Sequence, residues 1–396
     1  MSRRGVLIAS AFIVFAGVAW TGYLLFSGND EDDRHYARGE TELQISNVAG
    51  YPVSLFRAGR QVLDAMSIND NPTASLWLSA GNYFLSARTD DGHELLFPVS
   101  LTGYRSGPDV DGAFTVTVRP APAESPPQLR QDLPAYRFIP SGTFLLGDRL
   151  NPQEPHHVWQ TAYFISPFEV TNSQYHAFLS TPDGYPDDAN WTEEGRKWKV
   201  AGTSHASAQL TPNKADYVRF GLPDQPVTYV TWFEANAFCH WLTRRIGNGR
   251  WQYSLPTDAE WEKAARGPDN LDYGLGSTVS DADVDLYNWR KNPATREPVI
   301  GINASLTQFR PNRYGLYHMT GNVLEWSQSK YRPYSRAVPF ADDDRNHDDG
   351  TDRRSARGGS WYSASNAYLQ IPYRDAFQPE HSSHELGFRI VVHRLP

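Results

Sequence analysis

Arg357-Gly-Gly-Ser-Trp-Tyr-Ser363 is the stretch that decides how this chain of 396 residues is interpreted. Its paired glycines indicate a tight turn, and a tryptophan follows them directly. Working outward, other short strings rich in Gly, Pro and aromatic residues occur in a fixed order: Phe138-Ile-Pro-Ser-Gly-Thr-Phe-Leu-Leu-Gly147, Glu154-Pro-His-His-Val158, Phe168-Glu-Val-Thr-Asn-Ser-Gln-Tyr175, Pro226-Val-Thr-Tyr-Val-Thr-Trp232, Ala237-Phe-Cys-His-Trp-Leu242, Tyr253-Ser-Leu-Pro-Thr-Asp-Ala-Glu-Trp-Glu262, Ala264-Ala-Arg-Gly267, Tyr314-Gly-Leu-Tyr-His-Met-Thr-Gly-Asn-Val-Leu-Glu-Trp326 and Gly387-Phe-Arg389. Any one string is weak evidence, whereas the ordered set is strong.

Taken together, these strings resemble the formylglycine-generating-enzyme (sulfatase-modifying factor) family. The resemblance covers nearly all of residues 136–394. It implies a compact, irregular α+β domain with a C-type-lectin-like core. It also implies a chemistry, because catalytic members resemble copper oxidases that hold copper between two thiolates and convert a sulfatase cysteine to formylglycine.

Two cysteine positions of the catalytic members are occupied here by Ser363 and Tyr368, and the only cysteine in the chain is Cys239. Soft thiolates suit Cu(I), whereas a Ser hydroxyl stays protonated near neutral pH and Tyr has a pKa of about 10. We therefore expect neither copper nor formylglycine-generating activity. Ser360 matches a pocket serine of the family and Trp361 neighbours it, but without the cysteines their catalytic roles do not transfer.

The segment Gly321-Asn-Val-Leu-Glu-Trp326 is better preserved. In the family it supplies oxygen ligands to a structural calcium. Carried over by position, Asn322 and Glu325 would offer side-chain oxygens and Val323 a carbonyl, which suits a hard cation that needs six to eight oxygens. The alternative is a tight turn in which Asn322 and Glu325 cap the backbone without a metal.

Several histidines and acids invite metal hypotheses. His381 and His384 have ligand-like spacing, but two histidines fall short of the three protein ligands usual in a catalytic zinc site. His156 and His157 match a family string in which histidine is expected to be structural. An acidic loop surrounds Arg345 and His347, and we interpret it as solvated, with adventitious calcium as the alternative: Asp342, Asp343, Asp344, Asp348 and Asp349.

Three helix starts show the capping-box spacing of a Thr followed three residues later by Glu or Gln: Thr171 with Gln174, Thr231 with Glu234, and Thr257 with Glu260. After Thr231 the apolar residues follow one helical face as far as Ile246, and Gly247 is expected to end that helix. Cys239 lies on this face, so we expect a core thiol rather than a reactive one.

The N-terminus predicts a membrane anchor. Arg3 and Arg4 precede an uncharged, mostly apolar run over residues 6–26, about the 20 residues that a helix needs to cross a bilayer. Positive charge before the run and acid after it place the N-terminus in the cytoplasm and the bulk outside. Residues 1–35 are therefore expected to form an uncleaved anchor, with a cleaved signal peptide or a twin-arginine signal as alternatives. The expected location is a bacterial inner membrane, crossed once, with most of the chain in the periplasm.

Residues 36–119 are predicted to form a small β-sandwich-like domain. Apolar residues alternate with polar ones, as in Leu43 and Ile45 or Val53 and Leu55, and this period of two is typical of half-buried strands. Residues 120–135 are rich in proline and predict an extended linker. The family-like domain is then expected to span residues 136–396.

Composition narrows the classes of function. A hydrophobic content of 40% with 21% charged residues indicates globular domains rather than disorder. The net charge of −8 and the lack of a basic stripe in the sequence exclude nucleic acid as the expected partner.

Two hypotheses of function remain. In the first, a membrane-anchored, extracytoplasmic, non-catalytic module binds a protein or glycan partner in an envelope or secretion assembly. In the second, the chain is an oxidoreductase of the formylglycine-generating or siderophore-maturation type with altered metal chemistry. Fold analogy alone does not decide between them.

Overall fold

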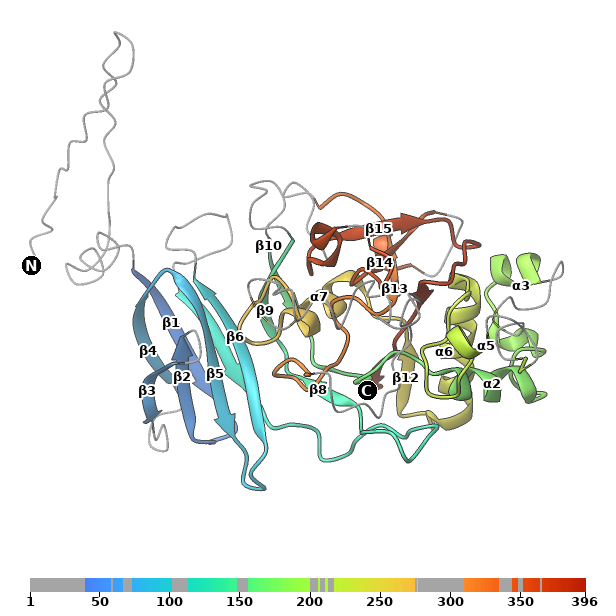
Figure 1. Ribbon diagram of the computed structural model, residues 1–396. Coiled ribbons are helices and arrows are strands. Elements are labelled where there is room, and N and C mark those ends of the chain that lie inside the picture. Colours follow the sequence, from blue (N-terminus) through green and yellow to red (C-terminus); the bar gives the residue numbers. More distant parts are fainter. Residues whose placement is uncertain are drawn as a thin grey trace, which may run out of the picture.

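The computed structural model describes residues 40–57, 60–66, 73–101, 113–147, 156–199, 206, 211–212, 217–274, 276, 310–334, 344–347, 352–363 and 365–396. They form a small β-sandwich followed by a larger domain of helices and sheets (Figure 1). The predicted membrane anchor, residues 1–35, lies outside these ranges. Inside them, no helix has both the length and the apolar character to cross a membrane.

The sandwich consists of a three-stranded and a four-stranded sheet that face each other. The strand orders are β4-β1-β7, in which β1 pairs with β7 in parallel, and β3-β2-β5-β6. The strands are β1 (Glu40–Asn47), β2 (Val53–Arg57), β3 (Arg60–Met66), β4 (Thr73–Ser79), β5 (Gly81–Arg88), β6 (Glu94–Leu101) and β7 (Ala113–Val118). Alternate apolar side chains, among them Leu43, Ile45, Leu85 and Val99, meet in one core between the sheets, because successive residues of a strand point to opposite faces.

The four-stranded sheet is covered on both faces. Leu85 and Phe97 point into the sandwich core, whereas Phe84 and Leu96 belong to a second core that they share with Trp261 of the large domain. Seven consecutive residues of β6 are buried for this reason. A strand buried on both faces has a continuous apolar run instead of an alternating one.

Polar contacts join the same two parts. The Asn270 amide donates to the Ser100 hydroxyl at 2.6 Å, and that hydroxyl donates to Asn82 Oδ1 at 2.6 Å. The Tyr314 hydroxyl donates to the Leu96 carbonyl at 3.0 Å. Because buried polar groups need partners, these bonds restrict how the sandwich can sit against the large domain.

The large domain contains two four-stranded sheets and a hairpin, in the orders β12-β17-β11-β8, β15-β14-β13-β16 and β10-β9. Its strands are β8 (Arg137–Ile139), β9 (Gly142–Leu146), β10 (His156–Gln160), β11 (Tyr163–Ile165), β12 (Trp251–Ser254), β13 (Leu324–Lys330), β14 (Arg354–Arg357), β15 (Arg374–Phe377), β16 (Leu386–Gly387) and β17 (Val391–Arg394). Its α-helices are α2 (Asn172–Ser180), α3 (Glu193–Lys199), α5 (Tyr217–Phe220), α6 (Trp232–Ile246) and α7 (Asp258–Arg266), and short 3-10 turns are η1 (Asp188–Asn190), η2 (Asp344–Asn346) and η3 (Asn366–Leu369). This mixture of helices and sheets confirms the predicted α and β class, and the C-type-lectin-like core stays a prediction.

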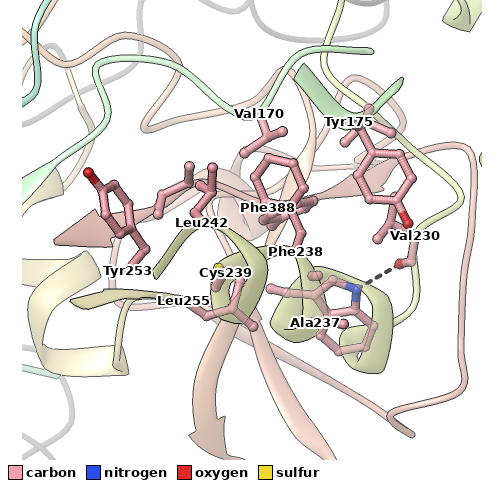
Figure 2. Packing of buried hydrophobic residues seen from close by; sticks show 14 of the residues in the cluster. Val170, Tyr175, Val230, Ala237, Phe238, Cys239, Leu242, Tyr253, Leu255 and Phe388 are labelled. Atoms are coloured by element: carbon pink, nitrogen blue, oxygen red, sulfur yellow. Dashed lines mark hydrogen bonds between the residues drawn. The ribbon is translucent and has the colours of Figure 1, made fainter. Parts of the chain in front are cut away.

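Helix α6 lies at the centre of the main core. The predicted capping box is present, because the Thr231 hydroxyl accepts from Glu234 N and the Glu234 carboxylate accepts from Thr231 N. The boxes that begin α2 and α7 are confirmed too. Figure 2 shows Cys239 of α6 among Leu242, Leu255 and other apolar side chains. Its thiol is fully buried, so the prediction of a core cysteine is confirmed.

The proline-rich segment contains neither helix nor strand between residues 119 and 136. It nevertheless lies against the large domain. The Tyr253 hydroxyl donates to the Pro127 carbonyl at 2.7 Å, and Arg130 pairs with Asp224 at 2.6 Å. The segment therefore lacks helix and strand, as its proline content predicts, but it is held against the large domain by these contacts.

Candidate functional site

The turn at residues 357–363 needs glycine at two positions. Gly358 and Gly359 have φ values of +91° and +67°, which L side chains rarely adopt. A Cβ on Gly359 would also lie 2.6 Å from the Tyr368 carbonyl oxygen, and one on Gly358 would lie 3.1 Å from the ring of Trp261. The chain can therefore leave β14 and pass this close to its neighbours only without side chains here.

Ser363 and Tyr368, which stand where catalytic family members are expected to have cysteine, have different surroundings. The Ser363 hydroxyl accepts from the Ser360 backbone N–H at 2.9 Å, and Ser363 N donates to the Ser360 carbonyl at 3.1 Å. Tyr368 is 40% exposed, and its ring meets that of Tyr373 edge-on at 5.0 Å. Ser363 therefore closes the turn by hydrogen bonding, while Tyr368 belongs to the surface.

Trp361 lies inside the turn and is 3% exposed. Its backbone N–H donates to the Asn322 carbonyl at 2.8 Å, which ties the turn to the segment before β13. Rings surround its indole at centroid distances of 5.1 to 6.3 Å: Phe220, Tyr362 and His384. The indole Nε1 is buried without a hydrogen-bond partner in the described structure. Trp361, two residues before Ser363, is thus packed among aromatic side chains.

Two carboxylates lie between the turn and the tyrosines. The Glu385 carboxylate accepts a hydrogen bond from the Ser360 hydroxyl. The Asp375 carboxylate accepts a hydrogen bond from the Tyr373 hydroxyl at 3.1 Å. Burial raises the pKa of Asp375, and the nearby charge of Glu385 raises it further. Sequence reasoning gave no role to Tyr362, although it stands in the quoted turn, and missed Tyr373, Asp375 and Glu385, which lie outside the quoted motifs.

The predicted calcium ligands lie in a buried polar network. Both oxygens of Glu325 accept from the Arg389 guanidinium at 2.6 Å, and the Trp261 indole donates to one of them at 2.7 Å. The Asn322 amide nitrogen donates to Glu169 at 2.8 Å, whereas Asn322 Oδ1 is buried without a partner in the described structure.

Charge pairing shapes this network. Although burial alone would raise it, the pKa of Glu169 is lowered by His318, whose Nδ1 lies 3.0 Å from the carboxylate, and by Arg389. Burial raises the pKa of Glu325. Both Glu325 oxygens already accept hydrogen bonds from Arg389. Calcium prefers several free oxygen ligands, so the predicted donor set does not fit calcium well. The calcium site stays a prediction.

The other predicted metal residues do not converge. His381 stacks flat on Phe377 at 4.6 Å, whereas His384 packs in the aromatic group around Trp361. His157 lies exposed on β10, and nothing is described of the His156 side chain. Over the described ranges, no group of three or more His, Cys, Asp or Glu side chains could hold a metal ion.

Most of the predicted acidic loop lies outside the described residues. Asp342, Asp343, Asp348 and Asp349 lie outside the described residues, and Asp344 begins η2. The Arg345 guanidinium lies 5.2 Å from the ring centre of Tyr334, inside the protein. Arg345 is therefore a buried residue rather than part of a solvated loop, and the remaining loop hypothesis stays untested.

Comparison with known proteins gives a consistent result. The model of the "Sulfatase-modifying factor enzyme 1-like domain" family matches residues 121–394. The chain is 28% identical to the formylglycine-generating enzyme of Streptomyces coelicolor over 68% of this chain and 91% of that protein. It is also 28% identical to the inactive C-alpha-formylglycine-generating enzyme 2 of mouse, over 65% and 85% respectively. Hercynine oxygenase of Mycolicibacterium smegmatis is 30% identical over 57% of this chain and 53% of that protein.

Proposed function

The chain belongs to the sulfatase-modifying factor enzyme 1-like family, and from this premise we propose that it is a non-catalytic member whose former reaction site is a binding surface. One observation carries the proposal. The chain has a single cysteine, and that cysteine is buried in α6. A copper site made of two thiolates therefore cannot be assembled within one chain.

The surroundings of Ser363 support the same conclusion. Its hydroxyl is engaged by the turn, and the neighbouring Trp361 is packed among the rings of Tyr362 and His384. Enzyme pockets are concave and bring polar groups together, whereas this region presents tyrosine rings to the solvent. The inactive mouse relative is a named precedent for a member without the reaction.

An altered oxidoreductase is the second candidate, and the similarity to hercynine oxygenase favours it. That hypothesis needs protein ligands for a metal other than copper. The part of the chain that the structure describes offers no three-residue group of that kind. The binding role is therefore the better supported of the two.

We further propose that residues 1–35 tether the protein to a bacterial inner membrane and that the bulk of the chain faces a protein or glycan partner in the periplasm. The apolar run after Arg3 and Arg4 supports this placement. Membrane fractionation and protease protection of the full chain test it. Extraction by salt or carbonate, without detergent, would contradict an integral anchor.

The test of the non-catalytic role uses the full chain, Cu(I), oxygen and a cysteine-containing sulfatase peptide, with the Streptomyces coelicolor enzyme as the positive control. We expect no loss of thiol and no formylglycine by mass spectrometry. Metal analysis of the purified protein should give no stoichiometric copper or iron. Turnover of the peptide, or stoichiometric copper or iron in the protein, would overturn the proposal.

A further inference from the structure

Exposed aromatic residues gather beside the turn at 357–363. Tyr362 is 53% exposed and Tyr368 is 40% exposed. Isolated exposed apolar residues are ordinary, but a group of tyrosines on one face is typical of an interaction site. We call this surface the tyrosine face, and it consists of Tyr362, Tyr368, Tyr373, Asp375, His384 and Glu385.

Contacts join these residues in two groups, one ending at Asp375 and the other at Glu385. Tyr368 meets Tyr373, whose hydroxyl donates to Asp375 at 3.1 Å. Burial raises the pKa of Asp375, and the charge of Glu385 raises it further. Glu385 is joined through Ser360 to the turn, and His384 lies 5.2 Å from the ring centre of Tyr362.

The face carries the carboxylates of Asp375 and Glu385, and within the described residues neither of them forms an ion pair with a lysine or an arginine. Arg374 follows Tyr373 in sequence, yet its side chain is only 6% exposed. Its guanidinium lies 3.8 Å from the ring centre of Tyr334 and donates to the Arg332 carbonyl and to Asp258. The carboxylates of Asp375 and Glu385 are each half-buried, and in the part of the chain that the structure describes they accept hydrogen bonds from the uncharged hydroxyls of Tyr373 and Ser360.

From this arrangement we propose that the tyrosine face docks a partner protein through a cationic side chain, above all arginine. A guanidinium can stack on a tyrosine ring and donate to carboxylates in the same plane. Hydrogen bonds between charged groups are about twice as strong as neutral ones. The tyrosines around them supply apolar contact area and exclude water, as at interface hot spots.

This inference rests on the proposed non-catalytic role, and it names the partner by its charge. It accounts for two features of the sequence together. Ser363 leaves the turn closed and uncharged. Tyr368 adds an aromatic ring to the surface at a position where the catalytic members of the family have cysteine. Hydroxyls stand at the two positions and carboxylates lie in the same face, and carboxylates accept the paired hydrogen bonds that a guanidinium donates.

The test selects a displayed library of random dodecapeptides against the full chain. We expect the enriched peptides to contain arginine severalfold more often than the starting library. Their affinity should fall at least tenfold in the double variant Asp375→Asn and Glu385→Gln. Both substitutions keep an oxygen that can accept from Tyr373 and Ser360, so the fold is preserved while the charge is lost.

The matched control is Asp188→Asn with Glu193→Gln, which removes two exposed carboxylates from the surface near α3. Binding should be unchanged in that control. Enrichment of acidic or neutral peptides, failure to enrich any peptide, or equal affinity in the Asp375 and Glu385 variant would overturn the inference. The sulfatase-peptide assay decides the non-catalytic role independently, so the two proposals can fail separately.

Discussion

Arg389 and Glu325 are the pair of side chains on which the buried network depends. Both are fully buried, and two hydrogen bonds of 2.6 Å join them. Removing one partner of such a pair leaves a charge in a medium of low polarity, which typically costs about 3–5 kcal/mol. The pair also receives the Trp261 indole, so its loss would disturb α7 as well as β13.

Glu325→Gln should therefore lower the free energy of unfolding by about 3–5 kcal/mol. Chemical denaturation followed by tryptophan fluorescence measures the change. The double variant Glu325→Leu with Arg389→Met removes both charges and should recover much of the loss, because well-packed apolar replacements of a buried pair are often tolerated. A single variant as stable as the parent would contradict the structural role of the pair.

Asn322→Ala provides a separate test of the calcium prediction. If Asn322 Oδ1 ligates calcium, millimolar calcium should raise the melting temperature of the parent protein and not of the variant, because a ligand stabilises the state that binds it. Given the engagement of Glu325 by Arg389, we expect the same melting temperature with calcium and with a chelator. A calcium-dependent rise lost in Asn322→Ala would establish the site.

Lys263 is a buried cation on α7 whose ammonium donates to the Pro140 carbonyl at 2.6 Å and the Gly142 carbonyl at 3.1 Å. Burial lowers the pKa of Lys263 to about 7. In the unfolded chain the pKa is about 10.4. Between these values the unfolded state binds more protons than the folded state, so the Lys263 contribution to stability increases with pH over this window.

Lys263→Met should remove that dependence. The free energy of unfolding of the parent relative to the variant should rise by about 2–3 kcal/mol between pH 7 and about pH 9.5, because one proton contributes at most about 1.4 kcal/mol per pH unit. Denaturant melts at several pH values measure it. Lys197→Met, at an exposed position, serves as the control and should show no such slope. Parallel curves for parent and Lys263→Met would contradict the shifted pKa.

At the scale of elements, the capping boxes are the most local feature of the fold. Thr231 and Glu234 are fully buried and satisfy each other's backbone N–H groups at the start of α6. Thr231→Ala should lower the free energy of unfolding by about 1–2 kcal/mol, while Thr231→Ser should cost less because it keeps the hydroxyl. Thermal unfolding by circular dichroism measures both. Equal losses in the two variants would show that the methyl group, not the cap, matters.

These elements also show what the sequence could predict. The capping boxes, the end of α6 at Gly247 and the core position of Cys239 depend on neighbours within a few residues, so local patterns were sufficient. The pairing of Glu325 with Arg389 and the hydrogen bond from Ser360 to Glu385 depend on segments that are well separated in the chain. No local spacing encodes such contacts, and the calcium prediction could not take account of Arg389 for that reason.

At the scale of the whole molecule, the doubly covered sheet makes the sandwich and the large domain one unfolding unit. Leu96→Asp would place a carboxylate in the shared core beside Trp261 and Tyr314, and burying an unpaired charge is strongly unfavourable. We expect a single calorimetric transition in the parent and two separate transitions in the variant. Val48→Asp, at an exposed site of the sandwich, is the control. Two transitions in the parent would contradict the coupling.

The covering of β5 and β6 on both sides has a consequence for how this protein can change over generations. A sheet with a solvent-exposed outer face tolerates substitutions on that face. Here Phe84, Leu96 and Ser100 each have a neighbour in the large domain. A mutation at one of these sites is best retained when its neighbour across the junction changes too. In homologues that keep this arrangement, the sandwich and the large domain should therefore coevolve. A chimera that carries the sandwich of a distant homologue should assemble poorly.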